Sequence, residues 1–298
     1  MDTGFICNLC PRECNVDRGL GKTGFCKVPN QIKVARAGLH FWEEGCISGS
    51  EGSGTVFFSG CNLRCVYCQN RKIAEDVYGK EITVDRLTAI FLELEKRGAN
   101  NINLVTPSHY VLQIIEALKL AKQQGLTVPV VYNSSAYEKV ETLKLLDGYV
   151  DVYLPDFKYM DDEIGKKYSN APDYSQVAKA AIAEMVRQVG TPCFDDREIM
   201  KKGVIVRHLV LPGFIDDSKK IIKYLYDTYG NDIYISILSQ FTPLSYLKEY
   251  PEIDRKITEA EYDEVVDYAI EIGVENGFIQ EGDVALESFI PDFDGQGV

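Results

Sequence analysis

From residue 54 onward, short apolar runs alternate with longer segments in which apolar residues recur every three to four positions. Short apolar runs are typical of strands buried on both faces, and the longer period is typical of amphipathic helices. The predicted strands cover residues 54–60, 101–107, 128–135, 150–158, 203–213 and 232–243. The predicted helices cover residues 83–98, 108–125, 136–147, 173–190, 215–229 and 258–276. The first helix has a start and a stop signal, with Thr83 as N-cap and Gly98 after the last turn.

Six consecutive strand–helix units predict an α/β fold with a parallel sheet and helices outside it. Six units are fewer than the eight of a closed TIM barrel, so we expect an open, partial (β/α)6 TIM-like barrel. This barrel would occupy residues 54–298, including a C-terminal helix and tail. Residues 1–53 are rich in glycine and cysteine and show little periodicity. They predict a small cysteine-rich, metal-binding appendage followed by a hairpin-like lead-in.

Polar residues stand at or just after the ends of the predicted strands. In α/β folds the carboxyl ends of parallel strands form the rim on which active sites lie. We therefore expect a site at this rim. The strand-end residues are Cys61, Thr106, Asn133, Asp156, Arg207 and Gln240.

Composition and charge narrow the class of protein. Apolar residues make up 45% of the 298 positions, which is enough for a sizeable core. The net charge of −13 argues against a nucleic-acid partner, which would require a basic surface. Apolar runs are too short to cross a membrane, and the N-terminus lacks the pattern of a signal peptide. We expect a cytoplasmic protein.

Nine cysteines are more than a cytoplasmic core usually requires. In a reducing compartment, clustered cysteines indicate metal or redox chemistry rather than disulfides. Seven of the nine fall into two tight groups. The other two, Cys46 and Cys193, are interpreted as ordinary small buried residues.

The first group is Cys61, Cys65 and Cys68, spaced C-x3-C-x2-C after the first predicted strand. Thiolates suit zinc and iron–sulfur clusters. Three cysteines leave one iron of a [4Fe-4S] cluster with an open position for a substrate or cofactor, which explains the missing fourth ligand. The alternatives are a zinc site completed by a distant residue and three buried core cysteines.

This motif, with the aromatic Tyr67 before its last cysteine, resembles the signature of the radical S-adenosylmethionine (SAM) superfamily. The resemblance implies a [4Fe-4S] cluster whose open iron binds SAM, reductive cleavage of SAM to methionine and a 5′-deoxyadenosyl radical, and a partial (β/α)6 barrel. The chain resembles most the pyruvate formate-lyase activase type, an anaerobic oxidoreductase that activates glycyl-radical enzymes. That resemblance implies a glycyl-radical protein as substrate and a flavodoxin- or ferredoxin-like electron donor.

Further segments resemble the same activases. "CNLRCVYCQN" is similar to their cluster loop and includes Asn70. "YLPDFKYMDDEIGKKY" is similar to their aspartate-x-lysine strand and the helix after it, which implies that Asp156 and Lys158 bind SAM. "VIVRHLVLPG" resembles their arginine strand and implies the same role for Arg207.

Two segments depart from the activase pattern. Where activases carry a Gly-Gly-Glu-Pro stretch, this chain has "LVTPSHY", so Thr106 and backbone carbonyls would have to contact the SAM amino group. Where activases carry Asp-Thr-Asn-Gly, this chain has "NSSAY", which begins with Asn133 and Ser134. The departures bear on the substrate more than on the radical chemistry.

The residues themselves support a cofactor site at the fourth and fifth strands. A zwitterionic cofactor needs a carboxylate and a cation opposite its own charges. Asp156 and Lys158 are two residues apart, so they point to one face of their strand. The alternative for this pair is a buried structural ion pair. Arg207 likewise suits either an inward-facing site or a structural pair.

The chain has three histidines. His208 alternates with Arg207, so it would point to the opposite face of the strand and lie outside the site. His40 and His109 have no partner visible in the sequence and are interpreted as structural.

The second cysteine group, Cys7, Cys10, Cys14 and Cys26, has four thiols, enough to close a complete metal site. Zinc binds four thiolates tetrahedrally and would stabilise a segment with little core. A second iron–sulfur cluster is the alternative metal, because Cys10–Pro11 is similar to iron–sulfur loops. Free, partly redox-active thiols remain a third interpretation.

The substrate remains the most open question. A small metabolite or another peptide could replace the glycyl-radical protein, and a metal-stapled redox or binding protein without turnover is a further alternative. The segment "SQFTPLSYLKEYPEIDRK" carries Tyr246 and Tyr250 after the sixth strand. These tyrosines are expected either to bind a macromolecule or to form a packed cover.

Overall fold

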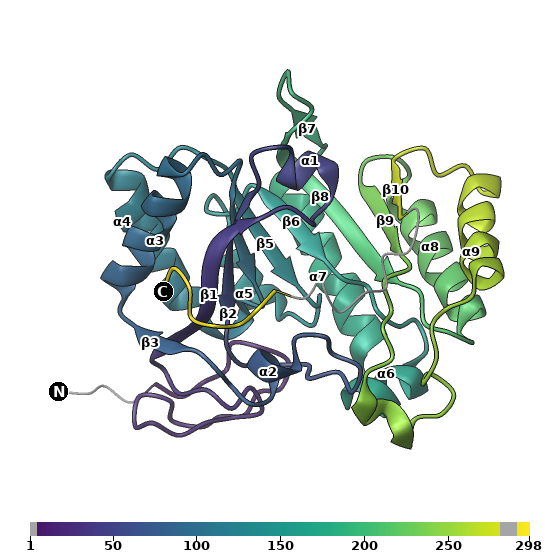
Figure 1. The fold of residues 1–298 in the computed structure, drawn as a ribbon, viewed down its shortest axis with the longest axis horizontal. Helices are drawn as coiled ribbons and strands as arrows, with labels where there is room; N and C mark the ends of the chain where they lie inside the picture. The colour runs from purple at the N-terminus through teal and green to yellow at the C-terminus, as the bar shows by residue number, and fades with distance from the viewer. Residues whose placement is uncertain (1–4, 281–290) are drawn as a thin grey trace.

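A twisted, mostly parallel sheet forms the centre of the computed structural model (Figure 1). The structure describes residues 5–280 and 291–298. Across these residues the neighbouring strands run in the order β10-β9-β8-β6-β5-β4-β2-β1-β3. Their bounds are β1 Ile32–His40, β2 Ser53–Phe58, β3 Lys80–Ile82, β4 Ile102–Val105, β5 Val130–Ser134, β6 Val152–Pro155, β8 Met200–Leu209, β9 Tyr234–Leu238 and β10 Gly277–Ile279.

The six predicted strands are confirmed as β2, β4, β5, β6, β8 and β9, and each pairs in parallel with the next. The sheet does not close on itself among the described residues, because its path ends at β10 and β3. The partial barrel predicted from the sequence is therefore confirmed. The helix expected over residues 258–276 is observed as α9, Glu259–Glu271, and the further strand β10 then continues the parallel sheet beside β9.

The lead-in to the barrel is part of the same sheet. Strand β1 pairs antiparallel with β2, with Arg36 opposite Phe57, and also pairs antiparallel with β3. This is the hairpin-like arrangement that the sequence predicted. The two-residue strand β7, Cys193–Phe194, pairs with β8 and projects away from the sheet (Figure 1).

Helices flank the sheet, with α3 and α4 at one end and α8 and α9 at the other (Figure 1). The described helices are α1 Gly45–Ser48, α2 Arg71–Ala74, α3 Val84–Lys96, α4 Val111–Gln123, α5 Val140–Lys144, α6 Asp162–Ser169, α7 Tyr174–Val189, α8 Ile215–Tyr229 and α9 Glu259–Glu271, with 3-10 turns at Ser108–Tyr110 and Ser245–Glu249. Within the described ranges, no helix combines the length and apolar character that a membrane crossing requires.

Most helix ends follow the sequence signals. The Thr83 side chain accepts a hydrogen bond from the Arg86 backbone N–H, and Gly98 has a φ of +88° just after α3. Of the helix expected over residues 136–147, only Val140–Lys144 is helical, as α5. Its first residues form a loop instead, because Ala136 has a φ of +56° and Glu138 turns into the interior.

Both faces of the parallel strands are buried, as their continuous apolar runs predicted. On β8, Val204 and Val206 pack in the main core, whereas Ile205 packs with Val131 and Val152 in a second cluster. Alternate side chains therefore point to opposite faces of the sheet. This burial makes the strands a rigid support for the residues at their ends.

The two isolated cysteines differ. Cys46 is buried, as expected. Cys193 is exposed, so its interpretation as a buried residue was wrong. Cys193 lies instead on β7, which projects from the sheet (Figure 1).

The cysteine-rich N-terminal segment packs against the barrel through Arg12. The Arg12 guanidinium donates hydrogen bonds to the backbone oxygens of Asn62 at 2.8 Å, Asn170 at 2.6 Å and Ser169 at 3.0 Å. Asn62 belongs to the loop of the cysteine triplet. The segment therefore supports that loop directly.

Candidate active site

A cavity of about 530 Å³ opens at the carboxyl ends of the parallel strands. Its volume lies within the roughly 300–1,000 Å³ typical of ligand and cofactor pockets. The structure brings all residues predicted for the cluster and for SAM to the wall of this one cavity. They are Cys61, Cys65, Tyr67, Cys68, Asn70, Thr106, Asn133, Ser134, Asp156, Lys158 and Arg207, together with Gln240 from the sixth predicted strand end.

The cysteine loop follows β2 and begins with a tight turn at Gly60. Gly60 has a φ of +88°, and a Cβ there would lie 2.6 Å from the Cys26 backbone oxygen. Only glycine fits this approach without displacing the chain. The Cys61 sulfur accepts hydrogen bonds from the backbone N–H groups of Leu63 at 3.3 Å and Arg64 at 3.4 Å. Such amides stabilise a sulfur that carries negative charge.

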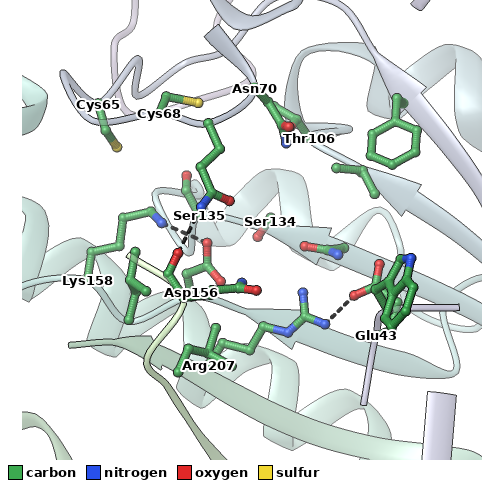
Figure 2. A pocket seen from close by; sticks show the side chains of 18 of the residues that line it. Glu43, Cys65, Cys68, Asn70, Thr106, Ser134, Ser135, Asp156, Lys158 and Arg207 are labelled. Atoms are coloured by element: carbon green, nitrogen blue, oxygen red, sulfur yellow. Dashed lines mark hydrogen bonds and ion pairs between the residues drawn. The ribbon is translucent and has the colours of Figure 1, made fainter. Parts of the chain in front are cut away.

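The thiols of this loop suit a soft metal. Burial raises the pKa of Cys61 to about 11 and raises that of Cys68 further. Without a metal these thiols are therefore protonated at neutral pH, and a bound metal would displace their protons. Cys65 is 9% exposed and reaches the same cavity, and Figure 2 shows Cys65 and Cys68 above the charged residues of the site.

Tyr67 contributes packing. Its ring lies against Tyr168 and Phe241, and its hydroxyl is 2.6 Å from the Tyr159 hydroxyl. Tyr159 in turn lies 2.7 Å from the Ser169 hydroxyl. The aromatic position of the motif thus fixes the cysteine loop onto the barrel, with its polar group directed into the protein.

Asp156 and Lys158 form an ion pair of 2.7 Å at the end of β6 (Figure 2). Their side chains are 28% and 13% exposed, so both charges are held at the cavity wall. Burial alone would lower the pKa of Lys158, but Asp156 raises it well above its usual range. The ammonium therefore stays charged and available to an anionic group.

The Tyr174 hydroxyl fixes the backbone of this pair. It donates to the Asp156 carbonyl oxygen at 2.7 Å and accepts from the Lys158 backbone N–H at 2.9 Å. Tyr174 is fully buried at the start of α7. Helix α7 thereby positions both charged residues at the rim.

Thr106 adopts an unusual backbone conformation at the end of β4. Its φ is +57°, a left-handed value that is costly for a β-branched residue. Its backbone N–H donates to the Asn133 carbonyl oxygen at 2.9 Å, which continues the ladder past the strand end. Such strain often marks functional positions.

Ser134 lies beside a buried acid, Glu138. Burial raises the pKa of Glu138 to about 7, although hydrogen bonds from Ser108, Ser134 and Tyr132 act in the opposite direction. Ser108 donates directly to the Glu138 carboxyl group. These contacts fix the loop after β5 against the end of the strand, where Asn133 and Ser134 face the cavity.

Arg207 meets two acids that sequence reasoning missed, Glu43 and Glu44 (Figure 2 shows the Arg207–Glu43 pair). Arg207 Nε lies 2.9 Å from Glu44 Oε1, and its Nη2 contacts both carboxylates. The side chains of Glu43 and Glu44 are 7% and 5% exposed. Burial would raise the pKa of Glu44, but Arg207 lowers it below its usual range. The cluster therefore has two carboxylates for one guanidinium.

The histidines occupy three different environments. His208 is buried outside the cavity, with Nδ1 2.8 Å from the Phe157 carbonyl oxygen, as the alternation of the strand predicted. His40 was interpreted as structural from the sequence, but it lines the cavity. His109 is buried near the N-terminal cysteines.

The tyrosines after β9 pack onto the site loop. The Tyr246 hydroxyl donates to the Cys68 carbonyl oxygen at 2.6 Å, and the Tyr250 ring meets Tyr168 edge-on at 5.7 Å. Both side chains pack against the main core. Of the two roles expected for them, the packed cover agrees with these contacts.

The residues present fit a [4Fe-4S] cluster and SAM. Three cysteines face one cavity, backbone amides approach the first sulfur, and a carboxylate and an ammonium lie across from them. A soft metal cluster needs the thiolates, and the amino-acid end of SAM needs the two opposite charges.

Comparison with known proteins identifies the family. The Radical SAM superfamily matches residues 55–225, more than half of the chain. This protein belongs to the Radical SAM superfamily. An uncharacterized protein of Methanocaldococcus jannaschii is 30% identical over 272 residues, which cover 88% of this chain and 74% of that protein.

The resemblance to activases is also confirmed. The pyruvate formate-lyase-activating enzyme of Clostridium pasteurianum is 27% identical over 189 residues, covering 60% of this chain and 70% of the enzyme. Streptococcus suis SuiB, in a crystal structure bound to S-adenosylmethionine, matches with a TM-score of 0.52 at 13% identity. That match covers 75% of this chain but only 49% of SuiB, and it supports the fold alone.

Proposed function

We propose that this chain is a radical SAM oxidoreductase that abstracts hydrogen from a glycyl-radical-type protein. With its cluster and SAM bound, one electron from a cytoplasmic flavodoxin- or ferredoxin-type donor would break the sulfur–C5′ bond, giving methionine and a 5′-deoxyadenosyl radical that takes a hydrogen atom from the substrate. The carrying observation is that Cys61, Cys65 and Cys68 share one cavity with Asp156 and Lys158.

The chain's own residues would bind and orient the reactants. The three cysteines hold the cluster, while Lys158 binds the carboxylate of SAM and Asp156 binds its ammonium group. The two side chains are already paired at 2.7 Å, so they are preorganised at the wall and need little reordering. Thr106, at the neighbouring strand end, would supply backbone or hydroxyl oxygens to the same ammonium.

The substrate assignment rests on the activase relatives and on the mouth of the cavity. Trp42 and Ile279 line the cavity and are 64% and 52% exposed. Large apolar side chains at a rim are typical of surfaces that receive another macromolecule. A small metabolite is the alternative substrate. The packed positions of Tyr246 and Tyr250 favour it, because these side chains do not offer a peptide-binding rim.

SAM cleavage is the first test. The full chain, purified and reconstituted anaerobically, is incubated with SAM and dithionite, and 5′-deoxyadenosine is quantified. We expect product from the native protein and none from Cys65→Ala. The matched control Cys46→Ala removes a cysteine outside both groups and should retain activity. Equal product from Cys65→Ala would contradict the assignment.

The substrate requires a separate experiment. Candidate glycyl-radical proteins from the same source are added, and the sample is examined by electron paramagnetic resonance. A protein-centred glycyl signal that depends on SAM and is absent with Cys65→Ala supports the proposal. If a small metabolite stimulates 5′-deoxyadenosine formation and no glycyl signal appears, the substrate is a small metabolite and the glycyl-radical proposal is wrong.

A further inference from the structure

Four cysteines outside the active site surround a second, much smaller cavity. Cys7, Cys10, Cys14 and Cys26 all line a space of about 10 Å³ within the N-terminal segment. Three of them are buried, and the Cys14 sulfur accepts a hydrogen bond from the Phe25 backbone N–H at 3.3 Å. Gly24 lies so close that a Cβ there would be 2.7 Å from the Cys14 sulfur. The backbone is thus wrapped around the sulfurs.

A buried cation lines the same cavity. The Arg18 side chain is fully enclosed, with the residue 1% exposed. Its guanidinium donates to the carbonyl oxygens of His109 and Pro29, both at 2.6 Å, and approaches the Cys7 sulfur at 3.8 Å. None of the ion pairs formed within the described residues includes Arg18, and its Nε is buried without a hydrogen-bond partner.

The rings of Phe5 and Tyr110 lie 5.9 and 5.5 Å from this guanidinium, but rings and carbonyl oxygens carry no formal negative charge, and a buried cation is costly unless such a charge lies nearby. Neutral thiols would not supply that charge. Four thiolates around Zn²⁺ carry a net charge of −2, and four thiolates around an oxidised [4Fe-4S] cluster carry the same. Either group would compensate Arg18. His109, which also lines the cavity, has a buried Nδ1 without a partner.

We propose that Cys7, Cys10, Cys14 and Cys26 bind a second metal centre as thiolates, with Arg18 as its charge partner. Among the described residues, no three candidate ligands converge on a single ion position as they stand, either here or in the active-site loop. At both places metal binding would draw the sulfurs together or bridge them through a cluster. The proposal is independent of the substrate and of SAM chemistry.

The centre would support the active-site loop. The Cys26 carbonyl oxygen packs against Gly60, and Arg64 of the loop donates to the Phe25 carbonyl oxygen at 3.2 Å. His109 Nε2 lies 2.8 Å from the Ser59 carbonyl oxygen, two residues before Cys61. The second centre therefore shares backbone contacts with the loop that carries the first.

Metal analysis of a variant without the active-site cysteines tests the proposal. The full chain carrying Cys61→Ala, Cys65→Ala and Cys68→Ala is purified anaerobically, and iron, acid-labile sulfide and zinc are measured. About one zinc per chain indicates a zinc centre, and about four irons with matching sulfide indicate a cluster; both support a thiolate centre. Adding Cys10→Ala and Cys14→Ala should abolish the metal, whereas adding Cys46→Ala and Cys193→Ser should not. Neither metal in the first variant, or metal that survives loss of Cys10 and Cys14, would overturn the proposal.

A second variant keeps the test decisive if the cysteine variants fold poorly. Arg18→Met removes the charge partner while retaining an apolar side chain of similar length. In the same background we expect a chelator to remove metal several-fold faster. Arg36→Met is the control, because Arg36 also donates to a backbone carbonyl oxygen but lies outside the cysteine-rich segment and does not line this cavity. An unchanged chelation rate, with a higher melting temperature in Arg18→Met, would show an uncompensated cation and contradict the proposal.

Discussion

Lys158 Nζ lies 2.7 Å from Asp156 Oδ2 across the end of β6, and both side chains line the cavity that holds the three cysteines. The pair is only partly buried, because Asp156 retains 28% of its side-chain exposure. It is therefore accessible to a ligand in a way that a closed structural ion pair is not. This distinction leads to the first prediction.

Lys158→Ala is expected to weaken SAM binding by about 1–3 kcal/mol, the range for a lost hydrogen bond to a charged group. The melting temperature should change little, since Asp156 can be hydrated once its partner is gone. Calorimetric titration of the reconstituted protein measures the affinity. Lys167→Ala, which breaks a surface pair of 2.7 Å with Glu252, is the matched control. A large loss of stability with unchanged affinity would identify the pair as structural.

Arg207 provides the second prediction, because two nearly buried acids depend on it. Arg207→Ala leaves Glu43 and Glu44 without their cation, and this should lower the free energy of unfolding by about 3–5 kcal/mol. Glu43→Gln and Glu44→Gln, combined with Arg207→Met, should recover most of that loss. Urea denaturation measures the free energy of unfolding of the single and the combined variants. Additive losses would show that these side chains do not interact.

The barrel and its rim could be predicted from the sequence because both follow from local patterns. Buried parallel strands are continuous apolar runs, and the residue at a strand end is read directly from where the run stops. Asp156 and Thr106 were found in this way, and both line the cavity. Strand β10 has only three residues, too few for such a run, so residues 277–279, just after the predicted helix, were not recognised as a strand.

Glu43 and Glu44 could not be predicted for a different reason. They meet Arg207 across more than 160 positions of sequence, and nothing in the local pattern marks them. Acidic residues before a short helix are ordinary surface residues in most chains. The antiparallel pairing of β1 with β2 places His40 opposite Ser53, the first residue of β2, and Glu43 and Glu44 reach Arg207 from that side of the sheet.

Thr106 provides the third prediction, from its left-handed backbone. A non-glycine residue at a φ of +57° loses roughly 1–2 kcal/mol relative to a relaxed conformation. Thr106→Gly removes this strain but adds about 0.5–1 kcal/mol of chain entropy to the unfolded state. The free energy of unfolding should therefore stay constant or rise by about 1 kcal/mol, while SAM affinity falls. Thr106→Val retains the strain and should show no gain. A clear destabilisation of Thr106→Gly in urea would mean that the threonine side chain stabilises the loop.

Glu138 provides the last prediction, which concerns pH. Burial raises its pKa from 4.5 to about 7, a difference that corresponds to about 3 kcal/mol. Below pH 4.5 the carboxyl group is protonated in both the folded and the unfolded chain, so it carries no penalty. As the pH rises toward 7, the unfolded chain loses its proton first, and the native protein loses stability. Above pH 7 the penalty is constant.

Glu138→Gln removes this titration while keeping an oxygen that accepts from Ser108. The stability of the variant relative to the native protein should therefore increase between about pH 5 and pH 7 and then level off. Thermal melts across this range measure the difference. Glu184→Gln is the control that should stay flat between pH 5 and pH 7, because the hydrogen bond from Arg187 lowers the pKa of Glu184 below 4.5, and the stability that its carboxylate contributes is lost only below that pH. A difference for Glu138→Gln that stays flat with pH would show that Glu138 is already ionised in the folded protein, with a cation or water reaching the loop behind Ser134.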